Sequence, residues 1–195
     1  MDRIAQLLYD TRMNTIKQNF HTVVIAGLKV DLPVLELPSG IGIAFFNLHG
    51  NQGLTEHCGK ALAERLDGID VLITAESKGL QLTHVVAREL GHEFYAVARK
   101  SKKLYMQDGI EITIDSSITT GQIQKLYLSQ HDKNLLSGKR VAIVDDVVST
   151  GNSLLGLEEL VNKAGGAVCK KAFVLAEGDA AKRTDIICLA AIPIL

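Results

Sequence analysis

The stretch that decides the fold is VAIVDDVVSTGNSLLGLEEL, residues 141–160. It begins with four apolar residues, Val141 to Val144, which are typical of a strand buried in a parallel sheet. We expect this strand to end at two adjacent carboxylates, Asp145 and Asp146. Small and hydroxyl-bearing residues follow, and the apolar spacing after them predicts a helix over 152–164. The stretch therefore predicts a strand, a tight loop and a helix N-terminus.

The predicted loop is suited to a phosphate. Free N–H groups at a helix N-terminus and the helix dipole attract anions, and Ser149, Thr150 and Ser153 add hydroxyl donors. The two carboxylates beside the loop suit a ribose diol. A phosphorylated sugar would therefore fit both the loop, through its phosphate, and the acid pair, through its hydroxyls. A solvated turn with a helix cap is the alternative, because Ser, Thr, Asp and Asn favour such places. The complete string favours the ligand site, and the G-x-x-x-x-G-K-[ST] loop of nucleotide-binding proteins does not occur in the sequence.

Composition limits the classes of protein that fit. The chain has 195 residues, 47% of them hydrophobic, which suits one domain with a proper core. A formal net charge of -1 gives no electrostatic support for a nucleic-acid or membrane partner. The three cysteines, Cys58, Cys169 and Cys188, are widely spaced, so we expect reduced, inert thiols in a cytoplasmic protein. The first residues do not form an apolar signal core, so we expect neither export nor membrane insertion.

Strand and helix signals alternate through the second half of the chain. Strands are predicted over 70–75, 94–99, 140–145 and 168–176, and helices over 55–66, 79–91 and 152–164. This order predicts an α/β fold with a parallel sheet covered by helices on both faces. A first helix over Ile4 to Ile16 and short extended segments over 22–26, 34–37 and 41–47, separated by Gly27, Pro33, Pro38 and Gly40, predict a small N-terminal cap.

We therefore expect two parts, an N-terminal helix and hood over 1–50 and a core over 51–195. The core includes a hairpin, because Ile110 to Asp115 alternates strictly and Ile123 to Leu128 can pair back after a turn over 116–121. The hairpin belongs to a segment of about 104–130 that is long for a simple crossover.

The apolar strand, the acid pair and S-T-G-N-S occur together in the motif that binds phosphoribosyl diphosphate (PRPP) in type I phosphoribosyltransferases, which this chain resembles from about Gly40 to Ala176. The resemblance implies their fold, a Rossmann-like parallel sheet with a small hood. It implies that Asp145 and Asp146 hold the ribose hydroxyls. The 5-phosphate is then held by Val148, Ser149, Thr150, Gly151, Asn152 and Ser153. Asn152 stands where many members have glycine.

A second loop follows the strand predicted over 70–75 and reads Glu76, Ser77, Lys78 and Gly79. By itself this string fits a capped surface turn about as well as an anion site. In the resembling family it is the pyrophosphate loop. Many adenine enzymes have arginine where this chain has Lys78, so a point charge replaces a planar fork.

A third segment, Ala98 to Leu104, reads A-R-K-S-K-K-L. By itself a cluster of four cations is typical of a solvated surface. It is similar to the A-R-K-x-x-K-L segment of adenine-type and xanthine-type enzymes, which implies that Arg99, Lys100 and Lys103 approach pyrophosphate, partly across a homodimer interface. The resemblance also implies Mg²⁺ as cofactor, contacted indirectly by Asp145 and Asp146.

The acceptor base is expected at Ile43 to Leu48, which reads I-A-F-F-N-L where adenine enzymes have V-L-F-R-D-I. The resemblance implies that Phe45 stacks on the purine. Phe46 is either a second base contact or a core residue, because alternation along a strand turns one ring of the pair inward. The resemblance also implies that the segment of about 104–130 is a lid that closes over PRPP. For proton chemistry this lid offers Tyr105 or Glu111, although any alternating hairpin exposes polar residues on one face.

The resemblance implies an enzyme that transfers the 5-phosphoribosyl group from PRPP to a purine, with adenine favoured, and releases pyrophosphate. Its catalytic residues are Asp145, Asp146, Lys78 and Arg99. The alternatives are xanthine or hypoxanthine and guanine as acceptors, or a non-catalytic PRPP sensor that regulates transcription or RNA. About 50 near-neutral residues before the core leave little room for a DNA-binding extension.

Overall fold

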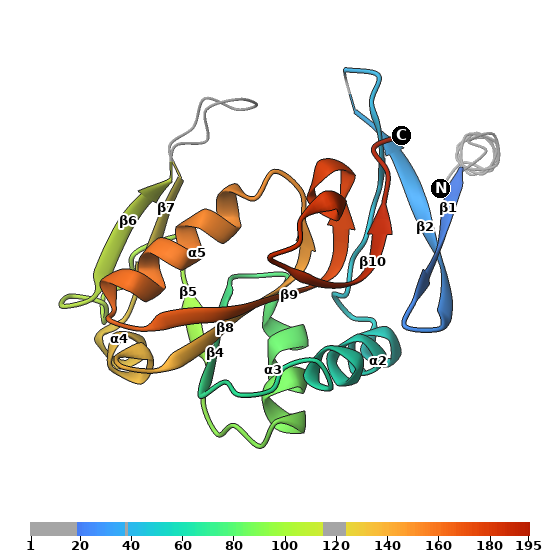
Figure 1. Cartoon of the computed structure of the whole chain (residues 1–195). Helices are drawn as coiled ribbons and strands as arrows, with labels where there is room; N and C mark the ends of the chain where they lie inside the picture. Colours follow the sequence, from blue (N-terminus) through green and yellow to red (C-terminus); the bar gives the residue numbers. More distant parts are fainter. Residues whose placement is uncertain (1–18, 38, 115–123) are drawn as a thin grey trace, which may run out of the picture.

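The computed structural model describes residues 19–37, 39–114 and 124–195. Its centre is a five-stranded sheet in the order β10-β9-β8-β4-β5, and every neighbouring pair is parallel (Figure 1). The strands are β4 (Val71–Ala75), β5 (Ala96–Ala98), β8 (Arg140–Val148), β9 (Ala167–Glu177) and β10 (Ile187–Ile192). This sheet confirms the predicted α/β fold class.

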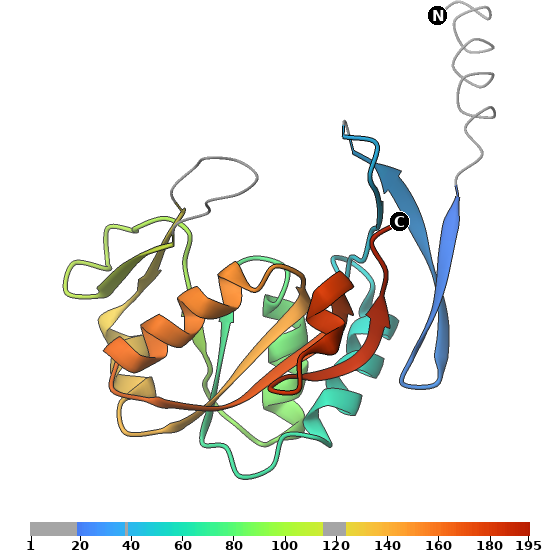
Figure 2. The same ribbon diagram turned by 45° about the horizontal axis from the view of Figure 1, so that its top comes forward.

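Helices cover both faces of the sheet, as predicted (Figures 1 and 2). The described helices are α2 (Gln52–Ala63), α3 (Leu80–Glu89), α4 (Gln130–Leu136), α5 (Asn152–Lys163) and the short 3₁₀ helix η1 (Gly178–Lys182). The alternation of side chains along each strand sorts them between two cores. Leu72 and Val144 pack with α2 and α3, whereas Val71 and Ile143 pack with α5.

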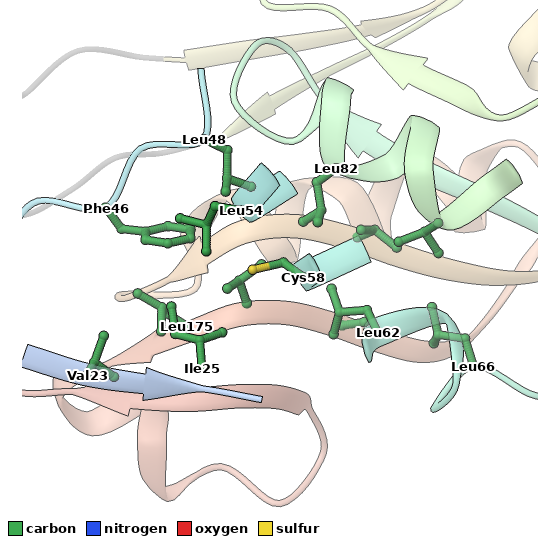
Figure 3. Packing of buried hydrophobic residues seen from close by; sticks show 14 of the residues in the cluster. Val23, Ile25, Phe46, Leu48, Leu54, Cys58, Leu62, Leu66, Leu82 and Leu175 are labelled. Atoms are coloured by element: carbon green, nitrogen blue, oxygen red, sulfur yellow. The ribbon is translucent and has the colours of Figure 1, made fainter. Parts of the chain in front are cut away.

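The core under α2 and α3 reaches from the sheet to the N-terminal strands (Figure 3). Cys58 and Leu62 of α2 are fully buried there, on the inward face that their spacing predicts. Burial raises the pKa of the Cys58 thiol to about 12, which agrees with the expectation of an inert cysteine. The helix begins at Gln52, since the side chain of Asn51 accepts a hydrogen bond from the Leu54 N–H at 3.1 Å.

The N-terminal cap is an antiparallel sheet in the order β1-β2-β3, formed by β1 (Phe20–Ile25), β2 (Leu28–Glu36) and β3 (Gly42–Ala44). Ala26 and Gly27 join β1 to β2 with φ values of 47° and 85°, as a two-residue hairpin turn requires. Pro33 was expected to separate two segments but lies inside β2. It is tolerated there because it forms the last pair with β1, and its carbonyl accepts the Phe45 N–H at 2.9 Å.

The cap is attached to the core at two places. The ring Nε2 of His57 in α2 lies 3.0 Å from the carbonyl oxygen of Ile25. Gly42 and Leu195 exchange two backbone hydrogen bonds of 2.8 and 2.9 Å, which fix β3 beside the end of the chain after β10. These contacts hold β1 beside α2, and β3 beside the residue that ends the chain after β10. The helix predicted over Ile4 to Ile16 lies outside the described residues.

The predicted hairpin is confirmed as β6 (Ile110–Ile114) paired with β7 (Gln124–Leu128) in antiparallel register. Its predicted turn lies outside the described residues. The prediction for β8 was wrong at one end, because the strand continues through the acid pair to Val148. Backbone pairing with β9 extends from Asp145↔Phe173 to Val148↔Ala176. This pairing keeps the chain extended although the two side chains are charged.

Three elements were missed, namely α4, η1 and β10. The apolar run from Ile186 to Ile192 was a signal for β10, whereas α4 and η1 are too short for a clear periodicity. Within the residues that the structure describes, no helix has both the length and the apolarity needed to pass through a bilayer.

Candidate active site

The loop after β8 encloses a small cavity at the carboxyl edge of the sheet. Its volume is about 150 Å³, and its lining includes Asp145, Phe173 and the loop residues Ser149 to Ser153. Gly151 is the N-cap of α5 and has a φ of 84°, a left-handed conformation that glycine adopts without a steric penalty. The predicted phosphate residues are therefore brought together around one cavity at a helix N-terminus.

The two acids of β8 have different surroundings. Asp145 is half-buried and accepts the N–H of Asp146 through Oδ1 at 2.9 Å. Asp146 is 5% exposed, and its Oδ2 lies 3.3 Å from Nζ of Lys78 without a hydrogen bond of acceptable geometry in the described part of the chain. Such a buried carboxylate oxygen is costly unless a ligand or cation satisfies it.

Burial and the neighbouring Asp146 carboxylate raise the pKa of Asp145 well above its usual range. The positive charge of Lys100, in the basic segment after β5, acts in the opposite direction and lowers the pKa of Asp145. A cation or a hydrogen-bonding diol at this edge would favour the ionised form of Asp145.

Lys78 lies between the acid pair and the predicted base site. Besides its 3.3 Å approach to Asp146, its Nζ is 3.4 Å from the carbonyl oxygen of Phe46 and 5.4 Å from the centre of the Phe45 ring. The side chain is 42% exposed, so its ammonium remains accessible to a ligand. In this structure Lys78 thus neutralises Asp146 and contacts the face of Phe45.

Gly79 brings the backbone of the loop after β4 against the acid pair. A Cβ atom on this residue would lie 2.2 Å from Oγ1 of Thr74 and 2.6 Å from Oδ1 of Asp145. No side chain fits into that space, so glycine is required by close approach. Thr74 was missed in the sequence, and its hydroxyl is fully buried without a partner in the described residues.

Both the carboxylate and the backbone N–H of Glu76 are hydrogen-bonded to other residues of the protein. Its carboxylate accepts from Nη1 of Arg99 at 2.9 Å and from the N–H of Lys100 at 2.6 Å, and its own N–H donates to Ala98 at 2.9 Å. The peptide bond from Glu76 to Ser77 is cis. The sequence analysis placed Glu76 among the pyrophosphate-binding residues. In the structure its carboxylate is hydrogen-bonded to the basic segment and is not available to a ligand in this state.

The basic segment starts at Arg99, whose Nη2 donates to the hydroxyl of Tyr105 at 3.1 Å. The backbone of Arg99 also exchanges two 2.9 Å hydrogen bonds with Tyr127 of β7. Lys100, Lys102 and Lys103 are exposed. The segment is therefore bound to the hairpin and to the loop after β4, while its lysines face solvent.

The two aromatic residues after β3 point in opposite directions. Phe46 is 2% exposed and packs in the core beside Leu54 (Figure 3), whereas Phe45 is 37% exposed and faces Lys78. The interpretation of Phe46 as a core residue is thus the one that the structure supports, and it replaces the expectation of a base contact. Phe45 keeps an accessible ring beside Lys78, which in turn lies beside Asp146.

The two candidates for proton chemistry, Glu111 and Tyr105, have different partners. Glu111 on β6 is exposed and forms an ion pair with Lys125 across the hairpin. The hydroxyl of Tyr105 instead accepts a hydrogen bond from Nη2 of Arg99 at 3.1 Å. The position of Glu111 agrees with the simple interpretation of a polar hairpin face.

A second cavity, of about 390 Å³, adjoins the phosphate loop and was not predicted. Its lining includes Ser149, Thr150, Glu177, Asp179 and Arg183. Glu177 ends β9, so the same rule that selected the loop after β8 could have found it. The side chain of Arg183 forms two hydrogen bonds with Asp185, of 2.9 and 2.7 Å.

The carboxylates fit a magnesium ion that arrives with its substrate. Asp146 offers a buried, unsatisfied oxygen of the kind that Mg²⁺ prefers. The described residues contain no group of three or more His, Cys, Asp or Glu side chains that could hold a metal by themselves. Most ligands of the ion would have to come from phosphate oxygens and water.

The comparisons with known proteins agree with this geometry. The model of the phosphoribosyl transferase domain matches residues 47–191. The xanthine phosphoribosyltransferase of an Exiguobacterium species is 34% identical over 140 residues, which are 68% of this chain and 71% of that protein. The Bacillus cereus xanthine phosphoribosyltransferase is 33% identical over 138 residues, 67% of this chain and 68% of that protein.

Among solved structures, adenine phosphoribosyltransferase from Thermoanaerobacter pseudethanolicus has a TM-score of 0.65 at 23% identity and covers 82% of this chain and 95% of its own. The Giardia lamblia enzyme complexed with 9-deazaadenine has a TM-score of 0.64 at 21% identity. The match covers 89% of this chain and 93% of the Giardia chain. These structures share the fold. Together with the sequence matches, they show that this chain belongs to the type I phosphoribosyltransferase family.

Proposed function

We propose that the protein transfers the 5-phosphoribosyl group of PRPP to a purine base, with adenine favoured, and releases pyrophosphate and a nucleoside monophosphate. The observation that carries this proposal is the cavity formed by Ser149 to Ser153 directly beside the acid pair of β8. A phosphate cradle and two carboxylates at one sheet edge match the two ends of a phosphorylated ribose.

In the proposed reaction the loop from Val148 to Ser153 binds the 5-phosphate through N–H and hydroxyl donors. Asp145 and Asp146 accept hydrogen bonds from the ribose diol and favour the positive charge that develops on the sugar. A magnesium ion bound with PRPP would supply positive charge at the diphosphate, with Asp145 and Asp146 near it.

The departing pyrophosphate is proposed to lie between the loop after β4 and the basic segment. Ser77, Lys78 and Gly79 provide a hydroxyl, an ammonium and close backbone, and Arg99, Lys100 and Lys103 provide further cations. Cations that are held in place before the reaction stabilise charge on a leaving group without reorganisation. For this role the Lys78 ammonium has to leave Asp146 or bridge it to the ligand.

The preference for adenine is supported by the side chains near the base site. Phe45 offers an accessible ring for stacking, which contributes about 1 kcal/mol beyond area burial. The cavity next to the loop after β8 is lined by Glu177, a carboxylate that accepts from an exocyclic amino group, whereas Asp179 is paired with Lys182 at 2.6 Å.

Xanthine is the second candidate acceptor, because the named relatives at 33–34% identity are xanthine phosphoribosyltransferases. An assay with PRPP, Mg²⁺ and each of adenine, xanthine, hypoxanthine and guanine, following pyrophosphate release, tests both candidates. We expect the highest kcat/KM with adenine. A higher value with xanthine would overturn the adenine preference alone.

Release with none of the bases, together with PRPP binding in calorimetry, would favour the sensor instead of the enzyme. Failure to bind PRPP at all would contradict the entire proposal.

We further propose that residues 1–50 act as a hood and 51–195 as the catalytic core, with the hairpin segment of about 104–130 as a lid over PRPP. The separate antiparallel sheet of the hood and the attachment of the hairpin to Arg99 support this division. A cytoplasmic homodimer is the proposed working form.

A further inference from the structure

Glu76 is an acidic residue in a loop that is proposed to bind a polyanion. A carboxylate facing pyrophosphate would repel it, so the presence of Glu76 between Ala75 and Ser77 needs an explanation. Its neighbours give one. The two carboxylate oxygens bind two consecutive residues of the basic segment, Oε2 the guanidinium of Arg99 and Oε1 the N–H of Lys100.

The carboxylate is protected from solvent, and its side chain is only 19% exposed. Burial acts to raise the pKa of Glu76, but the hydrogen bonds from Lys100 and Arg99 outweigh it and hold the pKa below its usual value. Glu76 therefore remains ionised at neutral pH and keeps both bonds charge-assisted.

The guanidinium of Arg99 is held from a second side by Tyr105, which accepts from Nη2 at 3.1 Å. A guanidinium has five N–H donors in a fixed fork, so two side-chain bonds leave the other donors for an anion. Two anchors also determine the plane of the fork. Arg99 is thus oriented before a ligand arrives, and the orientation comes from residues on two different loops.

The same carboxylate also positions Lys100. The Lys100 N–H is fixed by Glu76, while its charge acts on Asp145. On the other side, the backbone of Arg99 is bonded to Tyr127 of the hairpin. One carboxylate therefore connects the loop after β4, the basic segment and, through Arg99, the hairpin.

We propose that Glu76 is a positioning residue for the reaction under "Proposed function", on which this inference rests, and that it holds Arg99 and Lys100 in the geometry that receives the diphosphate of PRPP. It acts through these two residues and does not contact the diphosphate.

The test is the Glu76→Gln variant, because a positioning role and a purely electrostatic role predict opposite results. If Glu76 only adds negative charge, its removal lowers KM for PRPP. If it positions Arg99 and Lys100, we expect KM for PRPP to rise about tenfold and kcat to fall, while KM for the base is unchanged. Glu76→Asp keeps the charge and should recover part of the loss.

Glu56→Gln is the matched control. Glu56 forms the same kind of ion pair, with Arg88 at 3.0 and 2.6 Å, between α2 and α3 and outside the proposed site. It should leave both KM values unchanged. Tyr105→Phe provides a second variant if Glu76→Gln does not fold, since Tyr105 is 65% exposed, and it should raise KM for PRPP by a smaller factor.

Calorimetry with pyrophosphate and Mg²⁺ separates this inference from the proposed function. Binding by the unmodified protein with weaker binding by Glu76→Gln supports the inference even without turnover. An equal or lower KM or Kd in Glu76→Gln and Tyr105→Phe would overturn it while the enzyme assignment stands. An unmodified protein that binds neither PRPP nor pyrophosphate overturns both.

Discussion

The loop after β8 and the loop after β4 lie at the same edge of the sheet but are built in different ways. The loop after β8 encloses its cavity largely with its own residues, Ser149 to Ser153, and one positive φ at Gly151 shapes it. The loop after β4 obtains its geometry from elsewhere. Glu76 depends on Arg99 and Lys100, and Lys78 depends on Asp146.

The difference follows from the groups that each loop offers. Backbone N–H groups at a helix N-terminus are aimed by the local chain, so a phosphate cradle needs only a short sequence. Long cationic side chains have many rotamers and need partners to hold them in one orientation. A substitution in the loop after β8 should therefore affect mainly that loop. A substitution in the loop after β4 should also disturb the segments whose side chains it contacts.

The largest expected effect belongs to the acid pair beside the local loop. The double variant Asp145→Asn, Asp146→Asn should lose at least about a hundredfold in transfer rate, because its amides stabilise developing positive charge far less than carboxylates do. Circular dichroism should show an intact fold. Steady-state rates with the best base give the measurement, and unchanged turnover would refute the assignment of these residues.

An intermediate effect is expected from Lys78, which connects the two loops. Lys78→Met keeps the aliphatic stem but removes the ammonium 3.3 Å from Asp146, so kcat/KM for PRPP should fall about tenfold. Lys78→Arg should retain most activity, since the resemblance places arginine at this position in many adenine enzymes. If Lys78→Met matched the unmodified protein in both kcat and KM, the two loops would work independently.

The smallest effect concerns stability and pH. The folded protein raises the pKa of Asp145, so the folded state binds more protons than the unfolded one and its stability falls as pH rises above about 4. Asp145→Asn removes this cost and should be more stable than the unmodified protein at pH 8, with the difference vanishing near pH 3. Urea unfolding across this range measures it.

Asp70→Asn provides the control of opposite sign. Hydrogen bonds from Arg140 lower the pKa of Asp70 to about 2, so its stabilisation is present at neutral pH and is lost as pH falls toward that value. This variant should be less stable than the unmodified protein at pH 8. A stability loss for Asp145→Asn at pH 8 would show that the carboxylate is satisfied before ligand binding.

Much of the fold was predictable because it depends on short-range patterns. Apolar runs such as Val141 to Val144 located the central strands, and the alternation of Ile110 to Ile114 located the hairpin. The end of β8 was not predictable from its own residues, because pairing with β9 carries the strand past Asp145. The short helices α4 and η1 gave too few residues for a periodic signal.

In the candidate site, too, some features follow from the local sequence and others depend on tertiary contacts. The sequence alone located the loop after β8, the proposed phosphate site, because an apolar strand, an acid pair and a glycine-containing helix start produce their geometry within a few residues. Only the tertiary structure decided which of Phe45 and Phe46 is buried, where Lys78 rests and what Glu76 binds. Burial and ion pairing depend on contacts with residues that are far away along the chain. The local sequence does not specify those contacts, so they are known only from the folded structure.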